Sequence, residues 1–154
     1  MLNTVLALLL AVTSFTARFI QEKHVQLLQE VQHSEGQLVF RQPDYLKWEY
    51  TSPQPLVWEL NGEKTNMNPQ VKSMVMLIRQ CITGDYEKAE RSFTIQHNPD
   101  AVTLLPKKKE MQRLFKEMVI RLDPETEIAR EVTLIEVNDD KTTIRFFDVQ
   151  TSGL

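Results

Sequence analysis

The sequence predicts an α+β protein that is mainly β, built as an antiparallel meander of strands with one well-marked helix. Three observations indicate this class. Apolar and polar residues alternate along most of the chain, turn signals separate the alternating segments, and outside the N-terminus only residues 69–83 carry the signals of both helix ends. With 154 residues, 42% hydrophobic and 25% charged, the chain has the size and composition of one globular domain, which we place at residues 1–154.

The clearest alternation lies in residues 36–53, which we predict to form a β-hairpin with its turn at Pro43-Asp44. One side of this hairpin carries Leu38, Phe40, Gln42, Leu46, Trp48 and Tyr50. The residues between them are mostly polar, so one face packs on an apolar interior and the other faces water. Residues 56–60 predict a further strand, with Trp58 on its apolar side, that ends in an Asn61-Gly62 turn.

Residues 2–12 are apolar, and two interpretations stay open for them: a packed first helix or the remnant of a signal peptide. No Lys or Arg precedes this run, and no clear small-x-small cleavage pattern follows it. Residues 13–32 predict one long strand that bends or turns near residues 22–24, with a helix as the competing interpretation of its last part. The predicted apolar side of that strand carries Phe15, Ala17, Phe19, Val25, Leu27 and Val31.

The signals of a helix are complete in residues 69–83. Asn68 suits the N-cap, Pro69 the first helical position and Gly84 the residue after the last turn. The helix carries a wide apolar stripe made of Val71, Met74, Val75, Met76, Leu77, Ile78, Cys81 and Ile82. It is therefore either a helix packed on the sheet or a movable lid, since methionine adapts its shape to varied partners.

The second half of the chain returns to alternation. It predicts strands at residues 92–96, 102–105, 132–137 and 142–149, with turns at residues 98–100 and 138–140. Residues 107–122 follow a helical and an alternating pattern at once, and we predict a helical turn near residues 110–114 that passes into a strand by Glu117. The three lysines at 107–109 indicate a solvated loop, with a docking patch as the alternative.

Composition and motifs argue against several function classes. A net charge of -3 gives no basis for general nucleic-acid binding. His24, His33 and His97 lack metal-ligand spacing, so neither a metal nor another cofactor is predicted. The sequence has no GxSxG elbow and no glycine-rich phosphate loop, so we expect no enzyme. The one cysteine, Cys81, cannot form an intramolecular disulfide and leaves the compartment open.

Three sequence segments resemble the LolA-type outer-membrane lipoprotein carriers. They are the aromatic-spaced segment FTARFIQ at residues 15–21, a strand that ends just before Pro43, and the segment LKWEY at residues 46–50. The register of residues 105–107, 132–137 and 144–149 extends the resemblance over nearly the whole chain. The first strand and the proline-to-WEY hairpin are moderately specific, because a generic meander requires neither.

The resemblance implies a highly curved antiparallel sheet, an unclosed half-barrel whose concave mouth is covered by helices and whose interior holds acyl chains. It also implies a monomeric periplasmic carrier that works without ATP. Such a carrier would take acylated lipoproteins or other lipids from an inner-membrane ABC-type release complex to an outer-membrane acceptor. The residues expected to line the cavity are Phe15, Phe19, Leu38, Phe40, Gln42, Trp48, Tyr50 and Trp58 on the sheet, and Met74, Leu77 and Ile78 on the helix.

The chain departs from the family pattern at three places. Many family members have an arginine directly before the hairpin proline, tied to closure of the lid, whereas this chain has Gln42 there and Arg41 on the opposite face. We therefore predict that Gln42 points into the cavity and hydrogen-bonds carbonyl groups at the edge of the lid helix. The connection from Gly62 to Pro69 is shorter than the resemblance implies, and Leu154 comes before the family's usual final segment.

Other functions remain as alternatives. A periplasmic lipid-binding sensor or regulator on the same fold would be an interaction protein, and it would carry a second domain. An outer-membrane receptor would need a lipidated N-terminal cysteine, whereas Cys81 lies in the middle of the chain. A lipid-modifying enzyme is the least favoured alternative, because no nucleophile and base pair can be named.

Overall fold

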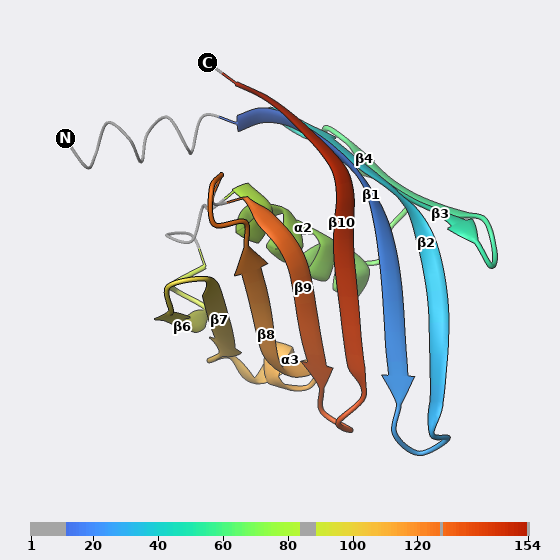
Figure 1. The fold of residues 1–154 in the computed structure, drawn as a ribbon, viewed down its shortest axis with the longest axis vertical. Helices are drawn as coiled ribbons and strands as arrows, with labels where there is room; N and C mark the ends of the chain where they lie inside the picture. Colours follow the sequence, from blue (N-terminus) through green and yellow to red (C-terminus); the bar gives the residue numbers. More distant parts are fainter. Residues whose placement is uncertain (1–11, 84–88, 127, 154) are drawn as a thin grey trace.

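A computed structural model describes residues 12–83, 89–126 and 128–153 of the chain and shows a strongly curved, ten-stranded sheet that wraps around one helix (Figure 1). The strands are β1 (Val12–Val25), β2 (Glu30–Arg41), β3 (Tyr45–Ser52), β4 (Leu56–Asn61), β5 (Lys64–Thr65), β6 (Phe93–His97), β7 (Ala101–Pro106), β8 (Phe115–Leu122), β9 (Ala129–Glu136) and β10 (Lys141–Gly153). The helices are α2 (Pro69–Thr83) and the short α3 (Lys109–Gln112). The predicted class, mainly β with an unclosed antiparallel sheet, is confirmed.

The sheet consists of two meanders joined at their inner edges. Its strand order is β5-β4-β3-β2-β1-β10-β9-β8-β7-β6, and every pairing is antiparallel. The pairing of β1 with β10 brings the two ends of the described chain side by side, from Val12 opposite Gly153 to His24 opposite Lys141. Because β5 and β6 form opposite edges, the connection that contains α2 has to pass from one edge of the sheet to the other, over the concave face.

The predicted hairpin of residues 36–53 is confirmed, with β2 pairing β3 so that Leu38 lies opposite Trp48 and Phe40 opposite Leu46. A bend or turn was predicted near residues 22–24, and its position is wrong. The chain turns fully at residues 26–29, so that Val25 lies opposite Glu30. This tight reversal removes Leu27 from the apolar side where alternation placed it, and leaves Leu27 92% and Leu28 64% exposed.

Helix α2 begins at Pro69 and buries its apolar stripe, as the sequence predicts. The Asn68 side chain accepts a hydrogen bond from the backbone N–H of Val71, as an N-cap does. The inward face of α2 is buried against the sheet along Val75, Leu77, Ile78, Cys81 and Ile82. The predicted cap at Gly84 lies outside the described residues.

The ambiguous segment of the second half, residues 107–122, folds as predicted. Residues 109–112 form α3 and the chain enters β8 at Phe115. The turns at residues 98–100 and 138–140 are also confirmed. Lys107, Lys108 and Lys109 are exposed, which agrees with a solvated segment, and the Lys107 ammonium donates to the carbonyl oxygen of Glu90.

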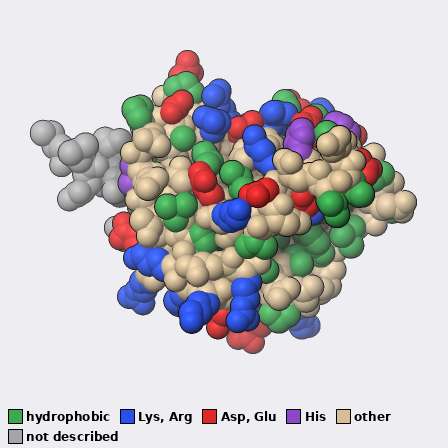
Figure 2. All heavy atoms as spheres, turned by 90° about the horizontal axis from the view of Figure 1, so that it is seen from below, with side chains coloured by type: hydrophobic (Ala, Val, Ile, Leu, Met, Phe, Trp, Pro, Cys, Tyr) green, Lys and Arg blue, Asp and Glu red, His purple; other side chains and the backbone are tan. Residues whose placement is uncertain are grey.

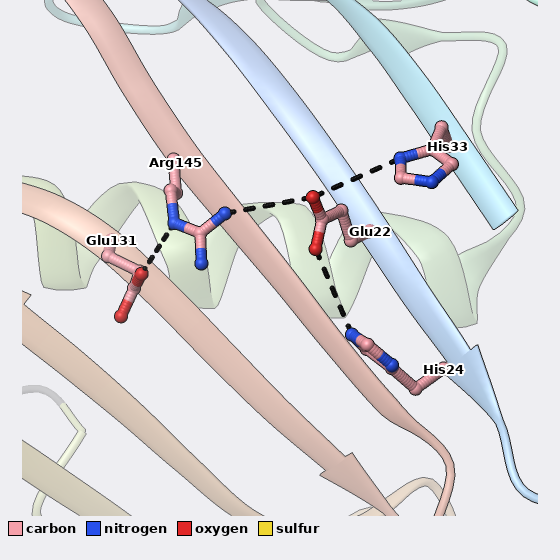
Figure 3. Close-up of polar contacts among 5 residues, drawn as sticks. All are labelled: Glu22, His24, His33, Glu131 and Arg145. Carbon is pink, nitrogen blue, oxygen red and sulfur yellow. Dashed lines mark hydrogen bonds and ion pairs between the residues drawn. The ribbon is translucent and has the colours of Figure 1, made fainter. Parts of the chain in front are cut away.

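The convex face of the sheet is polar, and charged side chains cross it from strand to strand. Figure 3 shows Glu22 of β1 between His33 of β2 and Arg145 of β10, on the side of the sheet that faces away from α2. Arg145 Nε lies 3.0 Å from a Glu131 carboxylate oxygen on β9. Such exposed cross-strand pairs each contribute a few tenths of a kcal/mol up to about 1 kcal/mol. We interpret this ladder as stabilisation of the solvated face.

The N-terminal apolar run, for which a helix or a signal remnant was expected, lies within residues 1–11 and so outside the described part, apart from Val12 at the start of β1. Among the described residues, no helix has the length and hydrophobicity needed to cross a membrane.

Candidate functional site

A cavity of about 350 Å³ lies between the concave face of the sheet and α2. Its lining residues come from the last residues of β1 and β9, the first residues of β10, the middle of β3 and β4, and the N-terminal half of α2. It therefore lies toward the lower end of the molecule in Figure 1, where the β1–β2 and β9–β10 turns are found. Figure 2 views this end directly and shows hydrophobic side chains gathered toward its right half, with Lys and Arg along its lower left border.

The apolar wall of the cavity consists of aromatic residues on one side and aliphatic residues on the other. Trp48 and Trp58 lie opposite each other on β3 and β4, with ring centroids 6.4 Å apart, and the Tyr50 ring meets Trp58 edge to face at 5.6 Å. The aliphatic wall is formed by Val71, Met74, Val75, Ile78, Leu114, Leu134 and Ile144. Apolar and aromatic side chains of this kind form most of the wall of a typical small-molecule pocket.

Five of the expected cavity residues line this cavity: Trp48, Tyr50, Trp58, Met74 and Ile78. Five others face the interior but are covered by neighbouring side chains. Each is at most 3% exposed: Phe15, Phe19, Leu38, Phe40 and Leu77. Phe15 stacks on Phe40 at 5.1 Å between centroids and meets Phe146 edge to face at 6.0 Å. Phe15 and Phe40 belong to a packed core at the other end of the same face, whereas Phe19 is in ring contact with Trp48 of the cavity wall, at 5.2 Å between centroids.

The expectation that Gln42 points into the cavity is wrong. Strand β2 ends at Arg41, so Gln42 belongs to the turn, where the alternation of a strand no longer sets the direction of a side chain. Gln42 is exposed and is not among the residues that line the cavity, which lies toward the opposite end of β2 and β3.

The turn is instead held by an arginine that comes from the helix. Arg79 of α2 donates from Nη2 to the Pro43 carbonyl oxygen at 3.2 Å, and its guanidinium carbon lies 5.4 Å from the centroid of the Phe40 ring. Burial lowers the pKa of Arg79, while the nearby Asp44 carboxylate acts in the opposite direction. A charged contact between helix and hairpin turn therefore exists in this chain, but the donor sits on the helix.

Polar groups also line the cavity, and the sequence analysis missed most of them. The Tyr50 hydroxyl donates to Gln21 Oε1 at 2.9 Å, and Lys23 Nζ lies 3.5 Å from a Glu136 carboxylate oxygen. Burial raises the pKa of Tyr50, and its contacts with Trp48 and Gln21 offset part of that rise. Gln21 and Lys23 share the odd side of β1 with Phe15 and Phe19, so the alternation of that strand already indicated their direction.

Gly36 makes the aromatic wall possible. It lies opposite Phe19 on β1 and opposite Tyr50 on β3, and the Phe19 and Tyr50 rings meet edge to face at 5.3 Å. A Cβ atom at Gly36 would lie 1.8 Å from the Glu49 carbonyl oxygen and 2.9 Å from the Phe19 ring. Only glycine leaves room for this approach of backbone and ring.

Within residues 12–83, 89–126 and 128–153, no group of three or more His, Cys, Asp or Glu side chains is placed to hold a metal ion. The described side chains around the cavity are mostly aromatic or aliphatic, with the Lys23–Glu136 ion pair and a few uncharged polar groups among them. Cys81 of α2 is buried against the sheet, and this burial raises its pKa to about 12. The cavity wall is therefore largely apolar, with one ion pair in it.

Comparison of the fold with solved structures gives matches to MucB. The MucA/MucB complex of Pseudomonas aeruginosa has a TM-score of 0.56 at 11% identity, covering 98% of this chain and 56% of that one. A structure of MucB has a TM-score of 0.55 at 12% identity, covering 98% of this chain and 57% of that one. This chain thus spans a little over half the length of those structures, and the likeness concerns the fold.

Comparison of the sequence gives the family directly. No curated protein matches the chain. The family described as outer membrane lipoprotein carrier protein LolA matches residues 11–153, which is nearly the whole sequence, and the chain belongs to that family.

Proposed function

We propose that this protein is a carrier that holds an acyl chain of a lipoprotein or another lipid in the cavity between its sheet and α2. The single observation that supports this most is the cavity itself, because two tryptophans, five residues of α2 and two strands of the other meander converge on an unfilled, largely apolar space. A folded protein normally fills such a space with its own side chains. Family membership adds the class of cargo, lipoproteins of the outer membrane.

The size of the cavity suits partial enclosure of one chain. About 350 Å³ lies at the lower end of the roughly 300–1,000 Å³ typical of ligand pockets. It has room for roughly a dozen methylene groups if each needs about as much space as a water molecule, about 30 Å³. Burial of each methylene contributes about 0.8 kcal/mol, so a fully buried sixteen-carbon chain would contribute on the order of 12 kcal/mol. Partial burial keeps the cargo releasable, as a carrier requires.

The remaining parts of the proposal follow from the family. The carrier works in the periplasm as a monomer and without ATP, receives its cargo from an inner-membrane ABC-type release complex and gives it to an outer-membrane acceptor. It acts by binding and release and performs no covalent chemistry. These partners and this location are expectations that the cavity alone does not specify.

Native mass spectrometry tests the proposal. The protein is purified without detergent from a membrane-containing host, and its spectrum is expected to show adducts with the masses of acyl-bearing lipids. Trp58→Asp, which places a carboxylate in the cavity wall, should lose the adducts. Lys47→Asp, on the opposite face of β3, is the matched control and should keep them. Absence of lipid from the parent protein, together with no binding of added fatty acids or esters, would contradict the carrier function.

A second candidate is an interaction protein, and one observation favours it. The β1–β2 turn exposes Leu27 and Leu28 to 92% and 64%, and Val31 beside them is 41% exposed. Large apolar side chains at a turn suit contact with another protein. One of the MucB structures is a complex with MucA(peri), so a protein of this fold does bind a protein partner. If Leu27→Ser with Leu28→Ser abolishes capture of a partner from a periplasmic extract while lipid adducts persist, the interaction role gains support.

A further inference from the structure

One strip of the cavity wall differs from the apolar remainder. It consists of Gln21 and Lys23 on β1 and of Trp48 and Tyr50 on β3, and we call these four residues the polar strip. The Tyr50 hydroxyl is its centre, since it donates to Gln21 Oε1 at 2.9 Å and lies beside the indole of Trp48. Lys23 stands nearer the open edge, paired at 3.5 Å with Glu136, and both side chains are about a third exposed or less.

The polar strip has one buried hydrogen-bond donor left over among the described residues. Trp48 is 2% exposed, and its Nε1–H finds no acceptor in hydrogen-bond geometry among the described residues, although it lies near the Tyr50 hydroxyl. The half-buried Gln21 side chain accepts from the Tyr50 hydroxyl through its oxygen, which places its amide group beside the same hydroxyl. A buried donor without a partner costs about 1–3 kcal/mol, so proteins rarely retain one without a reason.

We propose that the polar strip receives an acyl carbonyl group, so that the cavity binds a single acyl chain whose ester, amide or carboxylate oxygen lies against Trp48, Gln21 and Tyr50. The unused group, the Trp48 indole N–H, is a donor, and what it lacks is an acceptor. A carbonyl oxygen supplies acceptor lone pairs without adding a donor. Because the Trp48 nitrogen is itself buried, a small rotation of the Trp48 or Tyr50 ring accompanies binding.

The geometry places the rest of the ligand as well. The apolar wall continues from the polar strip toward Met74, Ile78 and Leu134, so the alkyl chain runs beneath α2. The head group then faces Lys23 and the open edge. A carboxylate head would compete with Glu136 for the Lys23 ammonium, whereas an ester would not, and this separates a free fatty acid from an esterified acyl group.

This inference rests on the proposed acyl-binding function, and its test is chosen so that the two can fail separately. The ligands are methyl octanoate, octanoate and n-octane, the last supplied through the vapour phase because it dissolves poorly. Their binding is measured by displacement of N-phenyl-1-naphthylamine from the full chain. If none of the three displaces the probe, the acyl-binding function fails. If all three displace it, the variants decide the role of the polar strip.

Trp48→Phe removes the indole N–H and keeps an aromatic ring, and Trp58→Phe is its matched control in the same wall. Trp48→Phe should weaken methyl octanoate about three- to tenfold, the effect of one neutral hydrogen bond, relative to Trp58→Phe. For n-octane, Trp48→Phe and Trp58→Phe should have the same affinity. Lys23→Met, with Lys47→Met on the convex face as its control, should weaken octanoate and spare the ester.

A second measurement does not depend on the variants folding well. The indole ¹⁵N–¹H resonance of Trp48 should move downfield when methyl octanoate is added and should respond differently to n-octane. Equal loss of affinity for ester and alkane in Trp48→Phe, or an indole resonance that responds alike to both ligands, overturns the role of the polar strip. A Lys23→Met variant that loses ester and octanoate affinity equally overturns the placement of the head group.

Discussion

The two ends of the concave face carry the same kinds of side chain but differ in how they are filled. At the end near the β2–β3 turn, Phe15, Phe40 and Phe146 are in ring contact and almost fully buried. We call this the packed end. At the end near the β1–β2 turn, Trp48 and Trp58 face a space of about 350 Å³, and we call this the cavity end. Both ends are built on the same strands.

The helix accounts for the difference. The N-terminal half of α2, with Val71 and Met74, covers the cavity end, and its C-terminal half, with Cys81 and Ile82, is buried against the sheet. Only the second half has a charged tie to the hairpin turn, through Arg79. One end is therefore filled with side chains, whereas the other encloses the space that we propose to bind an acyl chain, and paired substitutions at the two ends test this difference.

The largest effect is expected from a charge placed beneath α2. Leu77→Asp introduces an unpaired carboxylate at a position 3% exposed and should destabilise the protein by more than about 4 kcal/mol. Met74→Asp lies against the cavity, where its carboxylate keeps water, and should cost about 1 kcal/mol while weakening acyl binding at least tenfold. Urea midpoints and probe displacement measure both. Equal losses of stability would mean that both halves of α2 are core.

The next effect concerns the aromatic residues. Phe40→Ala empties a packed site and should cost about 3–5 kcal/mol, with little change in the acyl affinity of the folded fraction. Trp58→Ala removes a partly exposed wall residue and should cost less stability but lower the acyl affinity about tenfold or more. The fluorescence of Trp48 and Trp58 should also shift when an acyl ligand binds. Unchanged fluorescence with a ligand that binds by another method would contradict their place in the wall.

These pairs show what the sequence could and could not predict. Alternation identified the concave side of Phe15, Phe40, Trp48 and Trp58 correctly, because the direction of a side chain is a local property of a strand. It could not tell which of them face a cavity, since that depends on where a helix from a distant part of the chain comes to lie. The reversal at residues 26–29 was missed because no Gly, Pro, Asn or Asp marks it. The prediction that Gln42 points into the cavity was wrong for a related reason, because the alternation of the strand was extended one residue into the turn.

A thiol on the buried half of α2 reports whether the packed end stays closed. Burial raises the pKa of Cys81 to about 12, so at pH 8 the thiolate fraction is very small and iodoacetamide should react far more slowly than with the unfolded chain. Addition of methyl octanoate should not accelerate the reaction, because the ligand enters at the other end. Faster labelling with ligand would show that α2 opens as a whole and would remove the distinction between its halves.

The raised pKa of Cys81 also makes the free energy of unfolding depend on pH. The unfolded thiol ionises near its ordinary pKa of 9.0, whereas the folded thiol keeps its proton up to about pH 12. Below pH 9 the thiol is protonated in both states and costs no stability. Between pH 9 and 12 only the unfolded state loses the proton, so the free energy of unfolding falls by up to about 1.4 kcal/mol per pH unit. Cys81→Ala should show a shallower loss of stability between pH 8 and 10. Parallel pH profiles for parent and variant would contradict this.

The smallest effect is expected at the tie between α2 and the hairpin turn. Arg79 combines a hydrogen bond to the Pro43 carbonyl oxygen with a position over the Phe40 ring, and a charged donor of this kind is worth about 1.5–3 kcal/mol before losses to solvent. Because Arg79 is half-buried, we expect Arg79→Gln to cost about 1 kcal/mol. Arg41→Ala is the control, since Arg41 is exposed and stacks on Tyr45 on the other face.

The two variants also separate stability from uptake. If α2 is tied down only at the packed end, Arg79→Gln loosens the closed empty form and should speed the uptake of a fluorescent acyl probe, while Arg41→Ala leaves the rate as in the parent. Gln42→Arg adds a cation to the same turn but no contact with the cavity, so its effect on uptake should be smaller than that of Arg79→Gln. A larger change in Gln42→Arg or in Arg41→Ala would place the tie on the hairpin rather than on the helix.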